Sequence, residues 1–478
     1  MRRTGLTVAA RAPYACISVS LEFVMTRLAS KNLALAAVSL IALLAAPVAA
    51  QTIEQNAVAA HIGFLAGEEL QGRGSATRDE AIAAAYVAAQ FRLAGLTSAP
   101  TMDGYLQRAP VTITTPSGAA ALSAGQTRLA QGDDFAILTG GLTAASGVVT
   151  VATDPAAPPA GAEVLMIAPP EGPSIRAVYG AAMRSGAKVV ILRRTAALAE
   201  ATAHSAPRAP SIRLSETPAR GGPAVLVLSP EAYDALAAAG GTVAYDPGQV
   251  KIEEGVTTNA IGWLQGSDPS SGVLMISAHL DHIGVRSDGV VMYGANDDAS
   301  GTVAVIELAK ALAANGPHER SIMFVAYGSE EAGLLGSRYF VDHPPIPLEE
   351  IAANLEIEMI GDQDPQLPAG VMMMTGFERS NFGQALKDRG ALVGPDPYPE
   401  QNFFQRSDNY ALALKGIVAH TISGWATIPT YHTPEDTIEN LNIPFMTNAI
   451  QSLVEPLKAM ADGAFTPEWA EGGRPEAR

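Results

Sequence analysis

The sequence predicts an α/β fold with a mixed, largely parallel sheet flanked by helices, and a smaller inserted domain of α+β or β type. Two observations lead to this prediction. From Asn259 onward, apolar strand-like runs alternate with segments of helical spacing, which is typical of parallel strands joined by helices. Between residues 142 and 246, Ala, Pro and Gly surround short apolar runs. A chain of 478 residues is long enough for both domains.

The spacing of apolar residues predicts the elements in order along the chain. Helices are expected over residues 55–70, 79–96, 175–185 and 301–314. Short alternating strands are expected within residues 109–141, and buried strands over residues 164–167, 189–192, 225–228, 273–277, 321–327 and 417–422. We assign residues 51–141 and 247–465 to the main domain, residues 142–246 to the insertion, and residues 466–478 to a flexible polar tail.

The first fifty residues have the pattern of an export signal. Arg27 and Lys31 precede an apolar run over residues 33–46, and small residues ending at Ala50 predict cleavage before Gln51. The run is shorter than the roughly 20 residues of a membrane span, so we expect no stable anchor after cleavage. We expect a periplasmic or extracellular protein, with residues 1–24 an extension ahead of the true start at Met25.

Composition excludes several functional classes. The formal net charge of −17 disfavours nucleic-acid binding. The single cysteine, Cys16, lies in the expected signal segment. The mature chain would therefore have no disulfide, no cysteine nucleophile and no thiolate metal ligand.

Five short segments place carboxylates or imidazoles beside apolar runs. They are SAHLDHIG (277–284), GANDDASG (294–301), YGSEEAGLLGS (327–337), LEIEMIG (355–361) and YHTPEDT (431–437). The candidate ligands that they supply are His279, Asp297, Glu331, Glu358 and His432. Two of these segments, those of His279 and Glu331, follow predicted strands, whose carboxyl ends form the binding edge of an open α/β sheet. Two imidazoles and three carboxylates can hold two divalent ions if one carboxylate bridges them.

Neighbouring residues suggest supporting roles. Asp281, two residues after His279, can fix the orientation of that imidazole, whereas we leave His282 outside the ligand set. Glu330 and Glu331 leave a buried strand, where two like charges need cations to stay ionised. One glutamate can then bind metal while the other, Glu330, acts as a base toward a metal-activated water.

Two of the segments leave a choice between residues. Glu356 lies two residues before Glu358 and on the same strand face, and it is the weaker ligand candidate. Asp298 or Ser300 can cap the helix that follows Asp297.

Together these segments resemble the two-zinc exopeptidase family that includes bacterial leucyl aminopeptidase, aminopeptidase Y and glutamate carboxypeptidase II. The resemblance covers residues 259–464 and, more loosely, residues 65–74. It implies two zinc ions, with cobalt or manganese as substitutes, bridged by Asp297. His279 and Glu358 would complete one site, and Glu331 and His432 the other.

The resemblance also implies residue roles. Glu330 would be the general base, Asp281 would orient His279, and Tyr431 would lie near the oxyanion of the tetrahedral intermediate. It implies a cis peptide between Asp297 and Asp298 and a protease-associated domain at residues 142–246. One departure is Glu358, where many members have Asp.

The expected function is removal of N-terminal residues from peptides by an exported aminopeptidase. Three alternatives stay open: a carboxypeptidase of the same fold, a glutaminyl cyclase-like transferase with fewer metal ligands, and a receptor-like binding protein without catalysis. Arg406 is the one basic candidate for a carboxypeptidase pocket. It lies in the segment 403–408, where the family places substrate contacts. The sequence favours no particular oligomeric state.

Overall fold

The computed structural model describes residues 52–476, apart from residues 140, 153, 155–156, 158, 170–179, 181–182, 204–209 and 219–222. The expected signal segment, its cleavage point before Gln51 and most of the helix expected at residues 175–185 lie outside the described residues.

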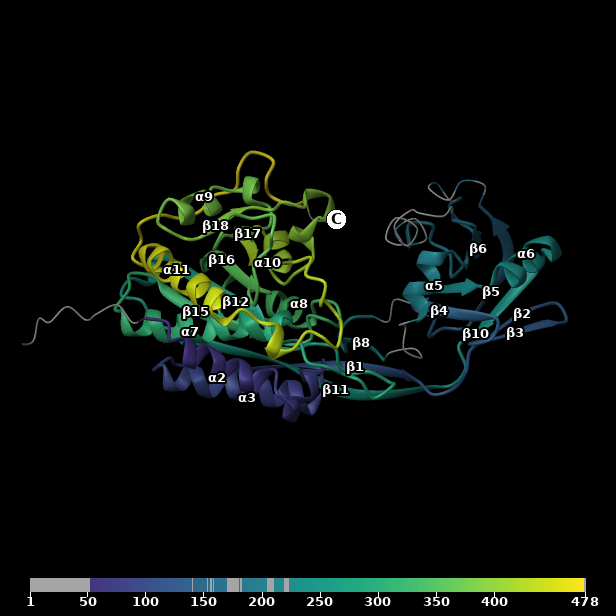
Figure 1. Ribbon diagram of the computed structural model, residues 1–478, viewed down its shortest axis with the longest axis horizontal. Helices are drawn as coiled ribbons and strands as arrows, with labels where there is room; N and C mark the ends of the chain where they lie inside the picture. Colours follow the sequence, from purple (N-terminus) through teal and green to yellow (C-terminus); the bar gives the residue numbers. More distant parts are fainter. Residues whose placement is uncertain are drawn as a thin grey trace, which may run out of the picture. The chain divides into compact units, whose positions relative to one another are not determined.

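A nine-stranded mixed sheet forms the centre of the main domain, in the order β18-β17-β19-β16-β12-β15-β11-β1-β8 (Figure 1). Its strands are β1 (Leu106–Pro116), β8 (Ser211–Leu214), β11 (Val250–Leu264), β12 (Val273–His279), β15 (Ser321–Tyr327), β16 (Ile351–Glu358), β17 (Met372–Met374), β18 (Val393–Pro395) and β19 (Ala419–Ser423). The adjacent strands β19, β16, β12 and β15 are parallel, and β11, β1 and β8 continue the sheet in antiparallel fashion. The predicted fold class is confirmed.

Helices cover both faces of this sheet. One face carries α2 (Gln55–Leu65), α3 (Arg78–Leu93), α7 (Ser300–Ala314) and α11 (Ile443–Ala461), and the other carries α8 (Leu335–Asp342) and α10 (Asn409–Lys415). Along β12, Leu274 and Ile276 belong to the first core and Val273 and Met275 to the second. The central strands are largely apolar because both of their faces are buried. No helix among the described residues has the length and apolar character of a membrane span.

The first helix ends earlier than the sequence predicts. α2 stops at Leu65 instead of residue 70, because Gly67 adopts an extended conformation with φ −72° and ψ 161°. A 3-10 helix over Glu68–Arg73 follows and ends in positive φ angles at Gln71, Gly72 and Arg73. α3 begins at Arg78, where the Thr77 hydroxyl caps it by accepting hydrogen bonds from two backbone N–H groups. This polar turn brings Arg73 into the interior, where its side chain is fully buried.

A second, eight-stranded sheet has the order β3-β2-β10-β5-β6-β7-β9-β4. Its strands are β2 (Ala121–Ala124), β3 (Thr127–Ala130), β4 (Phe135–Thr139), β5 (Ala145–Val151), β6 (Val164–Ile167), β7 (Val189–Arg193), β9 (Ala224–Leu228) and β10 (Thr242–Asp246). It has its own apolar cores on its two faces, with α5 (Ala196–Ala203) and α6 (Pro230–Ala239) beside it. The predicted insertion is therefore present as a separate β-rich unit.

The boundary expected at residue 142 needs correction. β2, β3 and β4 lie before that residue, yet they pair within the second sheet. β8 lies within residues 142–246, yet it pairs with β1 of the main sheet. The chain leaves the main sheet along β1 and returns along β11, and Pro116 pairs with Val250 at the end of this ladder.

The tail after residue 465 is ordered over its described residues, which corrects the expectation of a flexible tail. The Trp469 indole N–H donates to the Gly416 carbonyl at 2.9 Å. Its ring lies 5.5 Å from that of His420 and 6.3 Å from that of Phe404, centroid to centroid. Backbone hydrogen bonds also join Ala470 to Arg379 and Glu468 to Asn381, so aromatic and backbone contacts together anchor this polar segment.

Candidate metal centre

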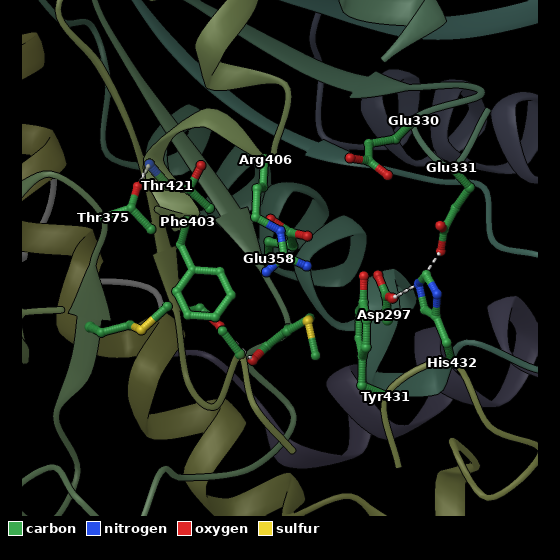
Figure 2. A pocket seen from close by; sticks show the side chains of 14 residues that line it. Asp297, Glu330, Glu331, Glu358, Thr375, Phe403, Arg406, Thr421, Tyr431 and His432 are labelled. Atoms are coloured by element: carbon green, nitrogen blue, oxygen red, sulfur yellow. Dashed lines mark hydrogen bonds and ion pairs between the residues drawn. The ribbon is translucent and has the colours of Figure 1, made fainter. Parts of the chain in front are cut away.

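The predicted site residues meet at the carboxyl ends of the parallel strands. His279 ends β12, Glu358 ends β16, and Glu330 and Glu331 follow β15 by three and four residues. Asp297 lies in the turn before α7, and His432 lies in the loop after β19. All five predicted ligands lie close together, and Figure 2 shows four of them around one pocket with Glu330 and Tyr431.

The ligand-type side chains form two groups that share Asp297. His279, Asp297 and Glu358 make one group, in which His279 Nε2 lies 3.3 Å from Asp297 Oδ1 and 3.8 Å from Glu358 Oε1. Asp297, Glu331 and His432 belong to the other, in which His432 Nε2 lies 3.1 Å from both Asp297 Oδ2 and Glu331 Oε1. Two oxygens of one carboxylate thus face two different groups, which is the arrangement of a bridging ligand.

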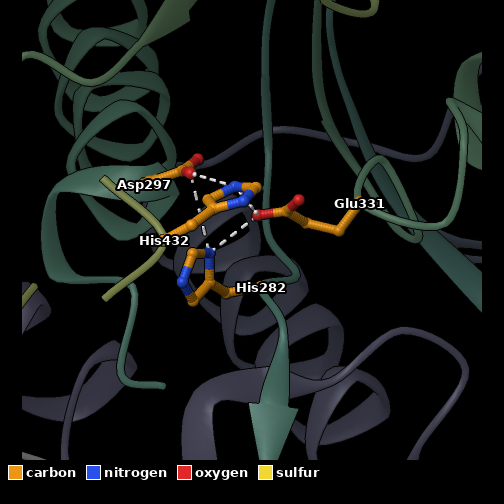
Figure 3. Close-up of side chains that lie close together, drawn as sticks. All are labelled: His282, Asp297, Glu331 and His432. Atoms are coloured by element: carbon orange, nitrogen blue, oxygen red, sulfur yellow. Dashed lines mark ion pairs between the residues drawn. The ribbon is translucent and has the colours of Figure 1, made fainter. Parts of the chain in front are cut away.

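His282 is a member of the second group as well, although the sequence interpretation left it outside the ligands. Its Nδ1 lies 2.8 Å from Glu331 Oε1 and 3.8 Å from Asp297 Oδ2, and the side chain has no exposed surface (Figure 3). Periodicity did not reveal it because His282 lies beyond the end of β12, where strand alternation no longer fixes the direction of a side chain.

The two groups suit divalent metal ions. Several of the facing atoms are buried without a hydrogen-bond partner among the described residues: His279 Nε2, His282 Nδ1, Asp297 Oδ2, Glu331 Oε1 and His432 Nε2. Buried polar atoms are normally satisfied, and mixed imidazole and carboxylate donors match zinc. Burial alone would lower the pKa of His432, but Asp297 and Glu331 raise that pKa to about 10. The two carboxylates therefore strongly favour a positive charge at the position of the His432 imidazole.

Asp281 supports the site differently from the expectation. The contact to His279 Nδ1 comes from the Asp281 backbone carbonyl at 3.2 Å, whereas the nearer carboxylate oxygen lies 3.8 Å away. The carboxylate instead accepts hydrogen bonds from the backbone N–H groups of Glu330, at 2.9 Å, and Glu331, at 3.3 Å. Asp281 thus fixes both the imidazole and the loop that carries the two glutamates.

The turn that carries Asp297 is held from several directions. Its peptide bond to Asp298 is cis, as the resemblance implies. The Asp436 carboxylate accepts hydrogen bonds from the backbone N–H groups of Asn296 and Asp297, at 2.7 and 3.1 Å. Asp298 points away and accepts from the Gly301 N–H at 2.8 Å, so it caps α7. Asp436 was missed in the sequence, although it stands four residues after His432 in the same motif.

Arg73 is a second residue whose role the sequence did not reveal. Its buried guanidinium donates to the backbone carbonyls of Leu65, Leu280, Tyr293 and Gly294. Burial lowers the pKa of Arg73 to about 10, against the opposing effect of nearby carboxylates. The guanidinium thus ties the loop after His279 to the turn before Asp297.

A cleft with about 480 Å³ of empty space, including its open mouth, lies over the two groups. Glu330 lines it without belonging to either group, and burial raises the pKa of its carboxyl well above the ordinary range. Tyr431 lines the cleft with its ring stacked on that of His432 at 3.8 Å. Arg406 points into it beside the Phe403 ring, 4.9 Å from the ring centroid (Figure 2).

The comparison with known families agrees with this geometry. Residues 259–455, which contain every ligand-type residue of the two groups, match the model of Peptidase family M28. The matched region carries the site and makes up less than half of the chain. The chain is 31% identical over 206 residues to leupeptin-inactivating enzyme 1 of Streptomyces exfoliatus, a match that covers 38% of this chain and 44% of the relative.

It is 27% identical over 184 residues to aminopeptidase YwaD of Bacillus subtilis, covering 36% of this chain and 37% of that one. The chain thus spans less than half the length of these curated relatives.

Two solved structures share the fold of this chain. An aminopeptidase from Aneurinibacillus sp. strain AM-1 superposes with a TM-score of 0.57 at 19% identity, covering 86% of this chain and 94% of the other. A zinc aminopeptidase from Bacillus subtilis gives a TM-score of 0.55 at 18% identity, covering 89% and 98%. At such identities the likeness establishes the fold, including an α/β main domain with a separate inserted domain.

Proposed function

We propose that the chain is a two-metal exopeptidase, and specifically an aminopeptidase that removes N-terminal residues from peptides. The observation that carries this proposal is the sharing of Asp297 by two groups of ligand-type side chains, with Glu330 in the same cleft and outside both groups. Zinc fits the mixed nitrogen and oxygen donors, with cobalt or manganese as substitutes. Two bound ions would supply Lewis acidity and lower the pKa of a water molecule.

The surrounding residues have roles that follow from their positions. Glu330 accepts the proton of the attacking water and passes it to the leaving amine, a transfer to which burial suits it by raising its pKa. Burial also raises the pKa of Tyr431, so its hydroxyl stays protonated and can donate a hydrogen bond to the developing oxyanion. Asp281 is a positioning residue, because it contacts the His279 imidazole and the loop that carries Glu330 and Glu331.

The charge of the cleft favours an aminopeptidase. Four carboxylates line it, those of Asp297, Glu330, Glu331 and Glu358, and two metal ions would leave acidic groups to receive the ammonium group of a substrate. Arg406 is the one lysine or arginine among the residues that line the cleft. It supports the carboxypeptidase alternative, in which a guanidinium would bind the substrate carboxylate. The complete ligand set disfavours both a glutaminyl cyclase-like transferase and a non-catalytic binding protein.

Blocked peptides test the proposal. An aminopeptidase cleaves free peptides and C-terminal amides at similar rates and loses activity on N-acetylated ones, whereas a carboxypeptidase shows the reverse pattern. A chelator should abolish activity, zinc should restore it, and dialysed active protein should contain about two metal ions per chain. Peptide cleavage by protein free of metal would overturn the metal-dependent mechanism.

We also propose that the protein is exported and begins at Gln51 after cleavage. The support is the pattern of basic, apolar and small residues over residues 27–50. Terminal sequencing of protein from the culture medium or periplasm tests it. A mature chain that retains Cys16 would contradict it.

A further inference from the structure

We infer that His282 is a fourth protein ligand of the ion held by Asp297, Glu331 and His432, so that the two ions are bound unequally. This inference rests on the proposed two-metal centre. It adds a residue to that centre and predicts the order in which the two positions fill.

The His282 side chain has the placement of a ligand. It is completely buried, its Nε2 has no hydrogen-bond partner among the described residues, and its Nδ1 lies 2.8 Å from Glu331 Oε1 without the alignment of a hydrogen bond. Its Nδ1 faces the same space as His432 Nε2, between Asp297 and Glu331 (Figure 3). The rings of His282 and His432 meet edge to face at 5.6 Å between centroids. An imidazole buried without partners is costly unless something binds its nitrogen.

The separations between the donor atoms match a tetrahedral site. Zinc bonds of about 2.0–2.2 Å to nitrogen and oxygen place neighbouring ligand atoms roughly 3.3–3.5 Å apart. The four contacts around this group are 2.8 and 3.8 Å from His282 Nδ1, and 3.1 and 3.1 Å from His432 Nε2. These four distances lie on both sides of the expected separation, and small shifts of the side chains would bring all four to it.

The backbone makes room for this imidazole at Gly294. A Cβ atom at that position would lie 2.4 Å from His282 Cγ and 2.3 Å from the Asp297 carbonyl oxygen, and φ is 61°. A glycine there lets the turn that carries Asp297 approach the ring from behind, which holds Nδ1 toward the carboxylates.

The other position lacks such a residue. Its group comprises His279, Asp297 and Glu358, with no fourth ligand-type side chain among the described residues. Sites closed by four protein ligands are typical of tightly held ions, whereas sites with three keep a position open for water or substrate. The first ion should therefore enter the His282 position, and the second should bind more weakly and exchange more readily.

Hydrogen bonding offers a different role for His282. Its Nδ1–H could donate to Glu331 and only orient that carboxylate. The variant His282→Asn separates the two roles, because an asparagine amide nitrogen can replace Nδ1 as a donor but supplies no imidazole. His282→Ala removes both functions, and His279→Asn is the matched control for the other position.

The first experiment titrates metal-free protein with zinc against a competing chelator. For the wild type we expect two binding steps, with the first zinc ion bound at least about 100-fold more tightly than the second. Losing a partner that only orients a ligand weakens metal binding by ~10–100-fold. In His282→Asn, zinc binding in the first step should weaken by more than that. His279→Asn should weaken the second step alone. A first step unchanged in His282→Asn but weakened in His282→Ala would show an orienting role and overturn the inference.

The second experiment needs no variant. X-ray absorption at the zinc edge counts imidazoles around the metal in wild-type protein loaded with one equivalent of zinc. Two imidazoles support the inference, since His282 and His432 share that position, and one imidazole overturns it. Failure of the wild type to bind any zinc would instead overturn the proposed metal centre itself, so the two failures are distinguishable.

Discussion

Arg73 Nη2 donates a hydrogen bond of 2.7 Å to the carbonyl of Gly294, the residue at which the chain turns toward Asp297. The same guanidinium bonds at 2.8 Å to the carbonyl of Leu280, the residue after His279. A side chain from the polar turn after α2 thus holds together the segments that carry His279 and Asp297. It supplies the rigid outer support that a metal site needs.

Arg73→Lys should loosen this support. Lysine keeps the positive charge but lacks the planar guanidinium group with which Arg73 reaches four separate carbonyls. Some of these buried carbonyls would therefore lose their hydrogen-bond donor. We expect a loss of about 3 kcal/mol in the free energy of unfolding and roughly 10–100-fold weaker zinc binding. Urea denaturation and chelator competition measure the two effects. Arg78→Lys, on an exposed arginine nearby, is the control and should change neither.

Glu330 and Glu331 form a matched pair for separating catalysis from metal binding. Glu330→Gln should lower kcat by about 10²–10⁴-fold while both ions stay bound, because it removes only the proton acceptor. Glu331→Gln should instead reduce the metal content, because its carboxylate belongs to the ligand group. Kinetics combined with metal analysis of both variants tests this. Equal metal loss in both would disprove the division of roles.

Gly294→Ala should disturb the centre through the position of His282. The added methyl would overlap the imidazole and require an unfavourable positive φ, which together cost about 2–4 kcal/mol. Gly289→Ala is the matched control, because its φ is 86° but no atom lies within 4 Å of the new methyl. We expect reduced zinc affinity only for Gly294→Ala. Equal effects of the two substitutions would show that backbone strain alone is responsible.

His420 should make the protein sensitive to acid. Burial lowers its pKa to about 4, from an ordinary value of 6.5, while its ring contacts the Thr375 carbonyl and the Ser380 hydroxyl. The unfolded chain therefore binds a proton more readily, so this contribution is present above pH 6.5 and is lost as the pH falls through 4. The loss is about 3 kcal/mol.

Urea denaturation between pH 7 and pH 4 measures this dependence. His420→Asn retains a donor toward Thr375 but does not titrate. The variant should be less stable at pH 7, and its stability should fall less steeply with acid. Parallel stability curves for the two proteins would assign the acid sensitivity to other groups.

The sequence predicted the parts of the fold and site that depend on local pattern. β6, β12 and β15 are largely apolar runs buried on both faces, and such runs are visible without a structure. β16 is a mixed case, because Asn354, Glu356 and Glu358 interrupt its apolar residues. Ligands that follow such strands can be expected to meet, because parallel strands end at one edge of the sheet. His279, Glu331 and Glu358 were found in this way.

The remaining features depend on contacts between distant residues. β2, β3 and β4 alternate like any short strands, and only their pairing assigns them to the second sheet. His282 and Arg73 lie in turns, where the direction of a side chain depends on backbone angles that periodicity does not encode. The end of the chain has a polar composition, and its order comes from an indole packed against His420 and from hydrogen bonds to Arg379 and Asn381.

The ladder between β1 and β11 makes everything from residue 117 to residue 249 the loop of one very long β-hairpin. Since Pro116 and Val250 are paired across that ladder, a two-residue turn would close it and reduce the protein to its main domain. Such a deletion would also remove β8 and leave β1 as a bare edge strand. A designer of that shortened protein would have to protect the new edge with charged residues, or self-association would follow.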